Sequence, residues 1–303
     1  MEMFSRLKML ALMACMICSL GAAAQEAYAN YVPSNKTLSF YYDNLRSTRT
    51  GKTYNLNSGT VSPGWHFDGN NVSVKQVVFD PSFADVRPTT TYCWFAWMIN
   101  LESITGIKYL NTSMVTTMHW MFQGCYVLTS LDLSGFNTDN VTDMSGMFAY
   151  YRLPTLDLSS FNTAKVKDMS YMFCYSPDLT TIYVGSGWTT AAVTQSVEMF
   201  LNCDGIVGSQ GTTYDASHID KAYAHIDGGP GNPGYFTEGP AVKRGDVNGD
   251  GNVNIADVTA LIDLLLTGDT TGNAAADCNQ SGGVNIADVT ALIDYLLGGS
   301  WPD

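Results

Sequence analysis

The residues with the clearest chemical potential lie close together near the C-terminus, in a stretch rich in Asp, Asn and Gly. Counted as a twelve-position loop from position 1, its oxygen-bearing residues are Asp246, Asn248, Asp250, Asn252, Asn254 and Asp257, with Gly251 at position 6. Short side chains at alternate positions direct their oxygens to one point, and glycine permits the sharp turn between them. The spacing therefore predicts a calcium loop, although a single copy would leave a metal-free surface turn as the alternative.

The same pattern recurs 31 residues further on. The matching residues of this second loop are Asp277, Asn279, Ser281, Gly282, Gly283, Asn285 and Asp288. The duplication favours metal binding over a chance turn, so we expect two Ca²⁺ sites. Because Ser281 stands where the first loop has Asp250, the second loop has two carboxylates against three, and we expect it to bind calcium more weakly.

Each loop must be held by the element that follows it. Residues 253–266 and 284–297 are identical except that Leu264 is replaced by Tyr295. In both segments apolar residues recur at helical spacing, as in Val258, Leu261 and Leu265. We expect two helices that pack face to face, with no helix before the first loop, which departs from a paired-helix EF-hand.

Duplicated loop–helix units of this kind resemble a type I dockerin, and the resemblance covers residues 245–298. It implies a cohesin module as partner. The family's contact positions carry over to mostly apolar residues, namely Ile255, Ala256, Ile262, Asp263 and Thr267, then Ile286, Ala287, Ile293, Asp294 and Gly298. Because both copies carry the same Ile-Ala pair, we hypothesise that the partner binds in either of two orientations related by the internal twofold.

A second repeat occupies the middle of the chain. The pair Met-Phe occurs at Met121, Met147, Met172 and Met199, at intervals of 26, 25 and 27 residues. Within a copy, Val141, Met144, Met147 and Phe148 have helical spacing, whereas Leu156 and Leu158 alternate with polar residues. We therefore expect a short helix and a brief strand in each copy, with the Met-Phe stripe in the core. Such a unit cannot enclose a core alone, so the copies are expected to stack as a solenoid.

Residues 110–118, followed by Met121 and Phe122, resemble the BspA-like leucine-rich-repeat family of bacterial surface proteins. Flanking segments 37–42, 79–83 and 232–236 are similar to that family's ends, so the resemblance covers about residues 36–237. It implies adhesion or recognition of a protein or glycan ligand rather than catalysis.

The N-terminus is typical of export. Arg6 and Lys8 precede the apolar run 9–20, and alanines 22–24 offer a cleavage site, so residues 1–24 are interpreted as a signal peptide. A lipoprotein box ending at Cys15 is the alternative. No later stretch has the length of a membrane-spanning helix. We expect a secreted, extracellular or cell-surface protein. Its five remaining cysteines show no CxxC pair, which favours buried thiols over a zinc site; Cys174 and Cys203 are the one pair worth testing for a disulfide.

Composition agrees with an exported calcium protein. The net charge is −13, and residues 245–303 contain nine Asp and no Glu, Lys or Arg. An acidic chain of this kind does not favour nucleic acid or anionic membranes as partners. The expected fold class is α+β, with an N-terminal β-rich cap (25–93), a leucine-rich-repeat solenoid and its C-terminal cap (94–237), a linker (238–244) and a small all-α dockerin (245–303).

No constellation for catalysis is visible. The four histidines, His66, His119, His218 and His225, stand in no metalloprotease, serine-triad or phosphate-loop motif. The Asp residues of the repeats recur with the period, as turn caps or a solvated face would. We expect a non-enzymatic binding protein. The alternatives are an accessory component of a carbohydrate-degrading complex, for which Trp65, Trp94 and Trp97 could contact sugar unless they are core, and a calcium module that only stabilises the chain.

Overall fold

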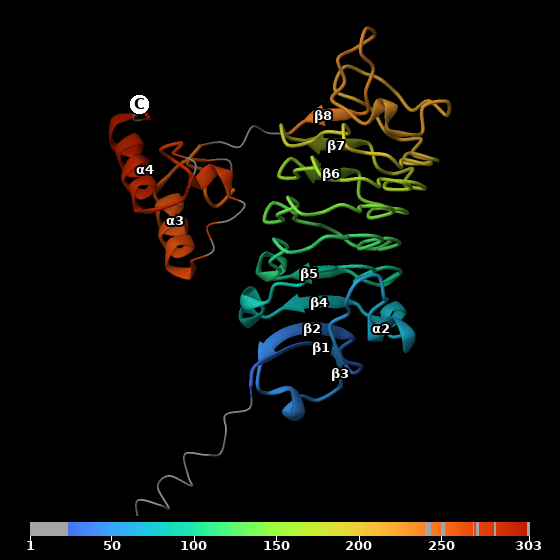
Figure 1. Ribbon diagram of the computed structural model, residues 1–303, viewed down its shortest axis with the longest axis vertical. Helices are drawn as coiled ribbons and strands as arrows, with labels where there is room; N and C mark the ends of the chain where they lie inside the picture. The colour runs from blue at the N-terminus through green and yellow to red at the C-terminus, as the bar shows by residue number, and fades with distance from the viewer. Residues whose placement is uncertain are drawn as a thin grey trace, which may run out of the picture.

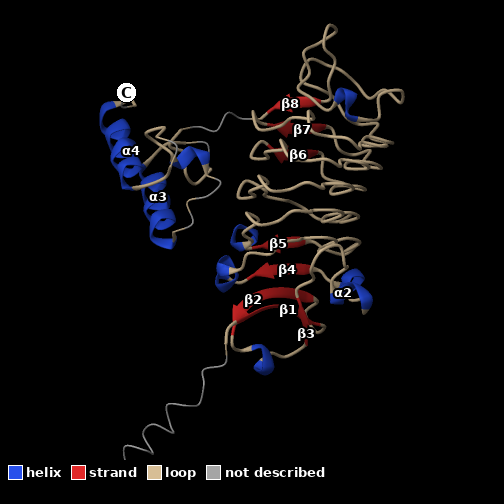
Figure 2. Cartoon of the chain, viewed as in Figure 1, coloured by secondary structure: helices blue, strands red, loops and turns tan. Residues whose placement is uncertain are grey.

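The computed structural model describes residues 24–239, 244–249, 252–268, 270, 273–281 and 283–301. Stacked layers of chain form one part, and a pair of α-helices with their loops forms the other (Figures 1 and 2). The strands are β1 Glu26–Val32, β2 Thr37–Asp43, β3 Lys52–Asn55, β4 Gln76–Phe79, β5 Ser103–Thr105, β6 Thr155–Leu158, β7 Thr181–Val184 and β8 Phe236–Glu238, and the α-helices are α2 Gly64–Phe67, α3 Ile255–Thr267 and α4 Ile286–Gly298. The predicted signal peptide, apart from residue 24, lies outside the described residues.

The first sheet has five strands in the order β3-β1-β2-β4-β5. Strands β1, β2 and β3 pair antiparallel, whereas β2-β4 and β4-β5 are parallel. Phe40 of β2 lies opposite Phe79 of β4, and their rings stack with centroids 4.6 Å apart. Trp65 and Trp94 pack around Phe40 and are fully buried. These two tryptophans therefore belong to the core, and their alternative role as sugar contacts is excluded.

The Met-Phe copies follow one another in parallel register. Isolated parallel bridges join Thr90 to Thr117, Thr117 to Asp143, Asp143 to Asp168, and Asp168 to Gln195. We call residues 90–206 the repeat row. The phenylalanines of successive copies contact one another, with ring centroids 5.4–6.1 Å apart from Phe95 to Phe200. The Met-Phe stripe is fully buried, so its predicted place in the core is confirmed.

The expected fold class, an α+β leucine-rich-repeat solenoid with a helix and a strand in each copy, is wrong. The described chain is mostly sheet, in two sheets, with three α-helices, and none of these helices lies in the repeat row. Where a helix was expected, the N–H groups of Met144, Gly146 and Phe148 donate to Asp168, Ser170 and Met172 of the next copy. A backbone that bonds outward at every second residue cannot also form the helical bonds to i−4.

Two further observations explain why the helical spacing misled. Gly146 and Tyr150 have φ values of 61° and 60°, which a right-handed helix does not contain. Met147 donates to the carbonyl of Met144, so a turn produces the three-residue spacing of the apolar side chains. The expected strand at Leu156 and Leu158 does form, as β6, with both leucines buried. It is the first strand of the parallel sheet β6-β7-β8.

The two C-terminal helices form a second, smaller core. Val258 and Leu261 of α3 pack with Val289 and Leu292 of α4, and Cys278 is buried beside them. Each helix ends at a glycine in the left-handed conformation, Gly268 or Gly299. The predicted helices are therefore confirmed, although both begin two residues later than expected because an Asn of the loop caps each one.

Candidate calcium centre and docking surface

The carboxylate at position 12 organises the first loop. Asp257 is fully buried, and its Oδ1 accepts the N–H of Asn248 at 3.0 Å while its Oδ2 accepts the N–H of Asn254 at 2.9 Å. Positions 3, 9 and 12 are thus drawn together by one side chain. Asp246 is half-buried, whereas Asn248 and Asn252 are exposed. Asp250 and Gly251 lie outside the described residues.

The second loop repeats this arrangement. Asp288 is fully buried and accepts the N–H groups of Asn279 at 2.9 Å and Asn285 at 2.8 Å. In addition, the N–H of Ser281 donates to Oδ1 of Asp277 at 3.0 Å and to Oδ1 of Asn279 at 2.9 Å. Because two oxygens share one donor, they must lie close to each other. Side-chain oxygens from positions 1 and 3 therefore converge in this loop.

The two Asn residues at position 9 have another task. The side-chain oxygens of Asn254 and Asn285 accept the N–H groups of Ala256 and Ala287, at 2.8 and 2.9 Å. Each Asn is the N-cap of its helix, and the Asp at position 12 completes a capping box. The carbonyl of Gly283, at position 7, accepts the Asn285 amide at 3.0 Å and the Ser281 hydroxyl at 3.4 Å.

This donor set fits a hard cation. Carboxylate, amide, hydroxyl and carbonyl oxygens are the ligands that Ca²⁺ prefers. The second loop presents them at positions 1, 3, 5, 7 and 12, and the first loop has the equivalent carboxylate at position 12. Among the described residues no three His, Cys, Asp or Glu side chains form a cluster suited to a metal. Amide and carbonyl oxygens, which also bind Ca²⁺, do not belong to such a cluster. Asp250 lies outside the described residues. A bound calcium ion would neutralise the carboxylates that each loop gathers.

All ten predicted contact residues lie on the surface of the helix pair. Ile255, Ala256, Ile262, Asp263 and Thr267 are exposed on α3, and Ile286, Ala287, Ile293, Asp294 and Gly298 are exposed on α4. The sequence reasoning missed Leu266 and Leu297, which are 80% and 84% exposed. Their positions relative to Ile255 and Ile286, eleven residues on, are those of one helical face. That spacing was the signal that could have identified them.

The cysteines are unsuited to metal binding or nucleophilic chemistry. Cys93, Cys125, Cys174, Cys203 and Cys278 are all buried and free. Burial raises the pKa of the Cys278 thiol, at position 2 of the second loop, to about 11. Burial likewise raises the pKa of Cys174 to about 12. A thiol with so high a pKa remains protonated at neutral pH, whereas the thiolate is the reactive and metal-binding form.

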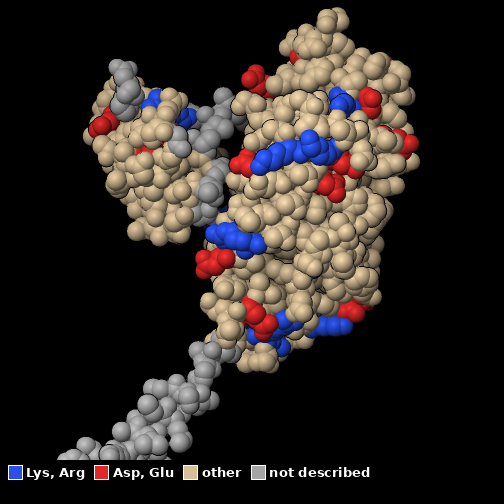
Figure 3. Space-filling view, viewed as in Figure 1, with Lys and Arg blue, Asp and Glu red and all other residues tan. Residues whose placement is uncertain are grey.

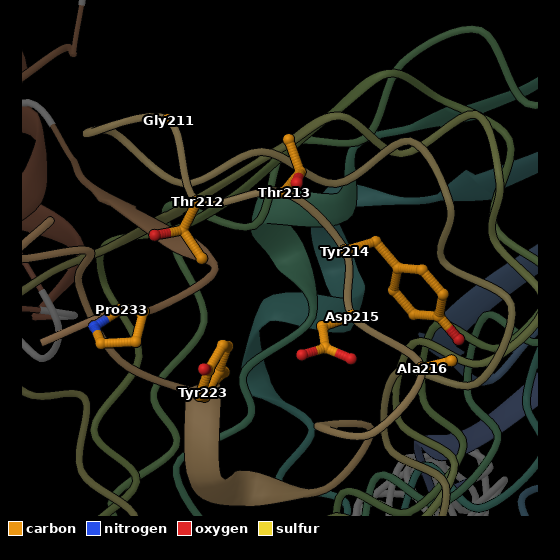
Figure 4. Close-up of a pocket in the computed structure, with 8 residues that line it drawn as sticks. All are labelled: Gly211, Thr212, Thr213, Tyr214, Asp215, Ala216, Tyr223 and Pro233. Atoms are coloured by element: carbon orange, nitrogen blue, oxygen red, sulfur yellow. The ribbon is translucent and has the colours of Figure 1, made fainter. Parts of the chain in front are cut away.

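A hollow lies just beyond the end of the repeat row. It has a volume of about 710 Å³ and is lined by Gly211, Thr212, Thr213, Tyr214, Asp215, Ala216, Tyr223 and Pro233 (Figure 4). Asp215 accepts Ser217 Oγ at 2.7 Å and lies 2.8 Å from Nδ1 of His218, which is also 3.0 Å from Ser217 Oγ. Both partners meet the same imidazole nitrogen. A serine triad needs them on opposite nitrogens, so this cluster closes a turn.

Comparison with known protein families assigns two parts of the chain. A family model described as the dockerin type I domain matches residues 244–297. A second model, described as a Mycoplasma protein of unknown function, DUF285, matches residues 93–213. A search of curated proteins found no match to the chain, and a search of solved structures found none either.

The first match confirms the predicted type I dockerin and covers both loop–helix units. Type I dockerins bind calcium, take a cohesin as partner and occur in extracellular proteins, so this segment is a calcium-dependent tether. The second match agrees with the BspA-like resemblance, but its description gives no function. In the part of the chain that the structure describes, no helix has the length and apolar character needed to cross a bilayer.

Proposed function

We propose that this chain is a secreted binding protein without enzymatic activity, in which the repeat row recognises a protein or glycan and the dockerin tethers it to a cohesin. The observation that carries the proposal is the equivalence of the two loop–helix units. Asp257 and Asp288 are both fully buried, and each accepts two loop N–H groups at 2.8–3.0 Å. Two calcium-ordered loops would then fix two helices that present the same apolar surface.

The docking surface is apolar and duplicated. Ile255, Ile262 and Leu266 lie exposed along α3, and Ile286, Ile293 and Leu297 repeat them along α4. Apolar side chains held at the surface by a small domain mark an interaction site rather than a core. The two sets are equivalent, so either could meet the cohesin, and one partner would bind in two orientations.

The absence of catalysis is part of the proposal. Burial lowers the pKa of His66 to about 4, so this imidazole is poorly matched to acid–base chemistry at neutral pH, and burial also lowers the pKa of His119. The periodic Asp residues cap turns: Asp132, Asp143, Asp157 and Asp168 each accept the N–H of the Ser two residues later. Their carboxylates are thus engaged in holding the backbone.

Binding of the purified chain to a panel of immobilised type I cohesins, with calcium and with excess EDTA, tests the tether. We expect binding in calcium and its loss in EDTA. A charged pair in one copy, Ile255→Asp with Ala256→Arg, should leave affinity within a few-fold of wild type, whereas the same change in both copies should abolish it. If calcium binds and orders the helices but no cohesin is captured, the module is a stabiliser only. Hydrolysis of a peptide or polysaccharide by the chain alone would contradict the non-enzymatic assignment.

A further inference from the structure

Two positions in every copy of the repeat row have a left-handed backbone. The first is occupied by Cys93, Trp120, Gly146, Tyr171 and Glu198, with φ between 52° and 61°. The second lies four residues later and is occupied by Trp97, Gly124, Tyr150, Tyr175 and Asn202, with φ between 56° and 69°. Each copy has one residue in the row of parallel bridges. The first left-handed position always lies three residues after that bridge residue, and the second always lies seven residues after it. The fold therefore imposes this conformation once per copy at both positions.

The residues found at these positions are not the ones that the backbone favours. Glycine and asparagine adopt positive φ at least cost, whereas a bulky side chain is strained there. Five of the ten residues are nevertheless Trp or Tyr. Backbone strain retained at equivalent places is an indication that the side chain itself serves a purpose.

The two glycines occur where a tryptophan needs the space. A Cβ on Gly124 would lie 2.7 Å from the ring of Trp97, and one on Gly146 would lie 2.1 Å from the ring of Trp120. Each indole thus rests against the backbone of the following copy. Trp97 remains 39% exposed and Trp120 36% exposed. The rings are supported from beneath and open to solvent, which is the arrangement of a binding platform.

Further aromatic rings extend these two platforms along the row. Trp97 lies 5.4 Å from Tyr150 and 6.2 Å from Tyr126, and Tyr150 stacks on Tyr175 at 4.9 Å, measured between centroids. At the first position, exposed Tyr171 follows Trp120 beyond Gly146. We call Trp97, Trp120, Tyr126, Tyr150, Tyr171 and Tyr175 the aromatic strip. It runs from copy to copy rather than forming a compact patch.

The six residues of the strip carry no charge, and Glu198 follows Tyr171 at the first position of the next copy. Arg152, whose guanidinium lies 5.8 Å from the Tyr126 ring, forms an ion pair with Asp178 at 2.9 Å. On the face shown in Figure 3, basic and acidic side chains of the layered part lie near each other, without a large field of one sign. The six aromatic side chains themselves offer no charge to an anionic or cationic ligand. The chemistry favours an uncharged ligand.

We propose that the aromatic strip binds a neutral polysaccharide chain. Tyr and Trp have apolar faces and polar edges, and a pyranose ring has C–H faces and hydroxyl edges, so the two are complementary. A polymer presents the same ring at regular intervals, and the strip presents aromatic rings in successive copies. A protein partner would also use Tyr and Trp, but such contacts concentrate in a central patch rather than along a line. This inference rests on the proposed binding function and names its ligand.

Electrophoresis of the calcium-loaded full chain through native gels that contain xylan, mixed-linkage β-glucan or galactomannan tests the proposal. The variant is Trp97→Asn with Trp120→Asn, because Asn tolerates positive φ and leaves the backbone unstrained. The matched control is Phe67→Asn, which removes an aromatic side chain that is 74% exposed and lies outside the strip. We expect at least one polysaccharide to retard the wild type and the control, and the double variant to bind at least tenfold more weakly with an unchanged unfolding temperature.

A second measurement needs no mutation. The bound polysaccharide should protect Trp97 and Trp120 of the wild type from chemical oxidation, as read by mass spectrometry. The proposal would be overturned if a polysaccharide retarded the chain without protecting the two tryptophans, or if the double variant bound as well as the wild type. It would also be overturned if a lowered unfolding temperature of the double variant accounted for its lost binding. No retardation in any gel would also overturn it, and would point to a protein ligand. Cohesin binding by the same sample separates the outcomes, because its persistence leaves the proposed function intact.

Discussion

The hydroxyl of Thr138 makes two hydrogen bonds to the backbone of Asn162, which lies one copy further along the repeat row. It accepts the Asn162 N–H at 2.8 Å and donates to the Asn162 carbonyl at 2.9 Å. Thr112 and Thr163 do the same with Asn137 and Thr189. All three threonines are buried. At these three junctions one buried hydroxyl therefore holds a copy to the next, in addition to the bridges of the backbone.

Replacement of Thr138 by Val should destabilise the repeat row. Val has almost the same shape, so the change removes the hydroxyl and leaves the N–H and C=O of Asn162 without that partner. We expect a loss of about 1–3 kcal/mol in the free energy of unfolding. Urea unfolding, followed in the transition that EDTA does not alter, measures it. Thr138→Ser keeps the hydroxyl and should lose markedly less; equal stability of Val and wild type would contradict the role of this bond.

Gly146 should not tolerate a side chain. An added Cβ would meet Trp120 at 2.1 Å, and the residue has φ of 61°. Gly146→Ala is therefore expected to cost about 1–3 kcal/mol of stability and to displace the Trp120 ring. Gly135→Ala is the matched control, because nothing lies within 4 Å of its Cβ position. Thermal unfolding and tryptophan fluorescence read the two effects, and similar values for both variants would exclude a steric role for Gly146.

The copies of the repeat row could be located from Met121, Met147, Met172 and Met199, but their conformation could not. Apolar residues three apart satisfy both a helix and a series of turns, and the choice depends on backbone bonds to the next copy, such as Met144 to Asp168. Local spacing carries no information on bonds that join residues about 25 apart. A helix was therefore expected where the chain forms bridged turns.

The C-terminal loops were easier to predict because their interactions are local. Asp257 bonds to residues three and nine positions away, and Asn254 caps the helix that follows it directly. The aromatic strip as a whole was missed for the opposite reason. Trp97 was a candidate sugar contact in the sequence but Trp120 was not, and only the folded structure shows that both rings are more than one-third exposed and that a glycine of the next copy lies against each. Gly124 and Gly146 were the available signal.

His66 should make the stability of the N-terminal layers depend on pH. Burial lowers its pKa to about 4 from an ordinary value of 6.5, and its Nε2 is buried without a hydrogen-bond partner. The unfolded state therefore binds more protons between these values, and stability must fall as the pH drops from 6.5 to 4. The loss amounts to at most about 3 kcal/mol.

Calorimetry of the transition that EDTA leaves unchanged tests this dependence. His66→Gln should flatten the fall in unfolding temperature across that pH range, whereas His225→Gln should retain it. Buried Asp227, whose pKa is lowered because Thr212, Gly229 and Gln210 donate hydrogen bonds that outweigh its desolvation, would act only at more acidic pH. A profile that is the same with and without His66 would refute its assignment as the titrating group.

Removal of calcium should unfold the C-terminal helices. Without the ion, each loop holds neighbouring carboxylates, and the capping boxes that begin α3 and α4 depend on Asp257 and Asp288. Far-ultraviolet circular dichroism should therefore show loss of most helical signal in excess EDTA and its return with calcium. Magnesium added instead of calcium provides the control. An unchanged spectrum in EDTA would show that the loops fold without metal.

The two loops should differ in affinity. The first has three carboxylates, Asp246, Asp250 and Asp257, and the second has Asp277 and Asp288, with Ser281 at position 5. Since each added carboxylate strengthens attraction to Ca²⁺, titration calorimetry should resolve a tight site and a weaker one. Asp257→Asn should remove the tight site while the weak one persists, and Ser281→Asp should bring the second site toward the first. Two equally tight sites in the wild-type chain would mean that the geometry of the loop, such as the shared Ser281 N–H between Asp277 and Asn279, outweighs the number of charges.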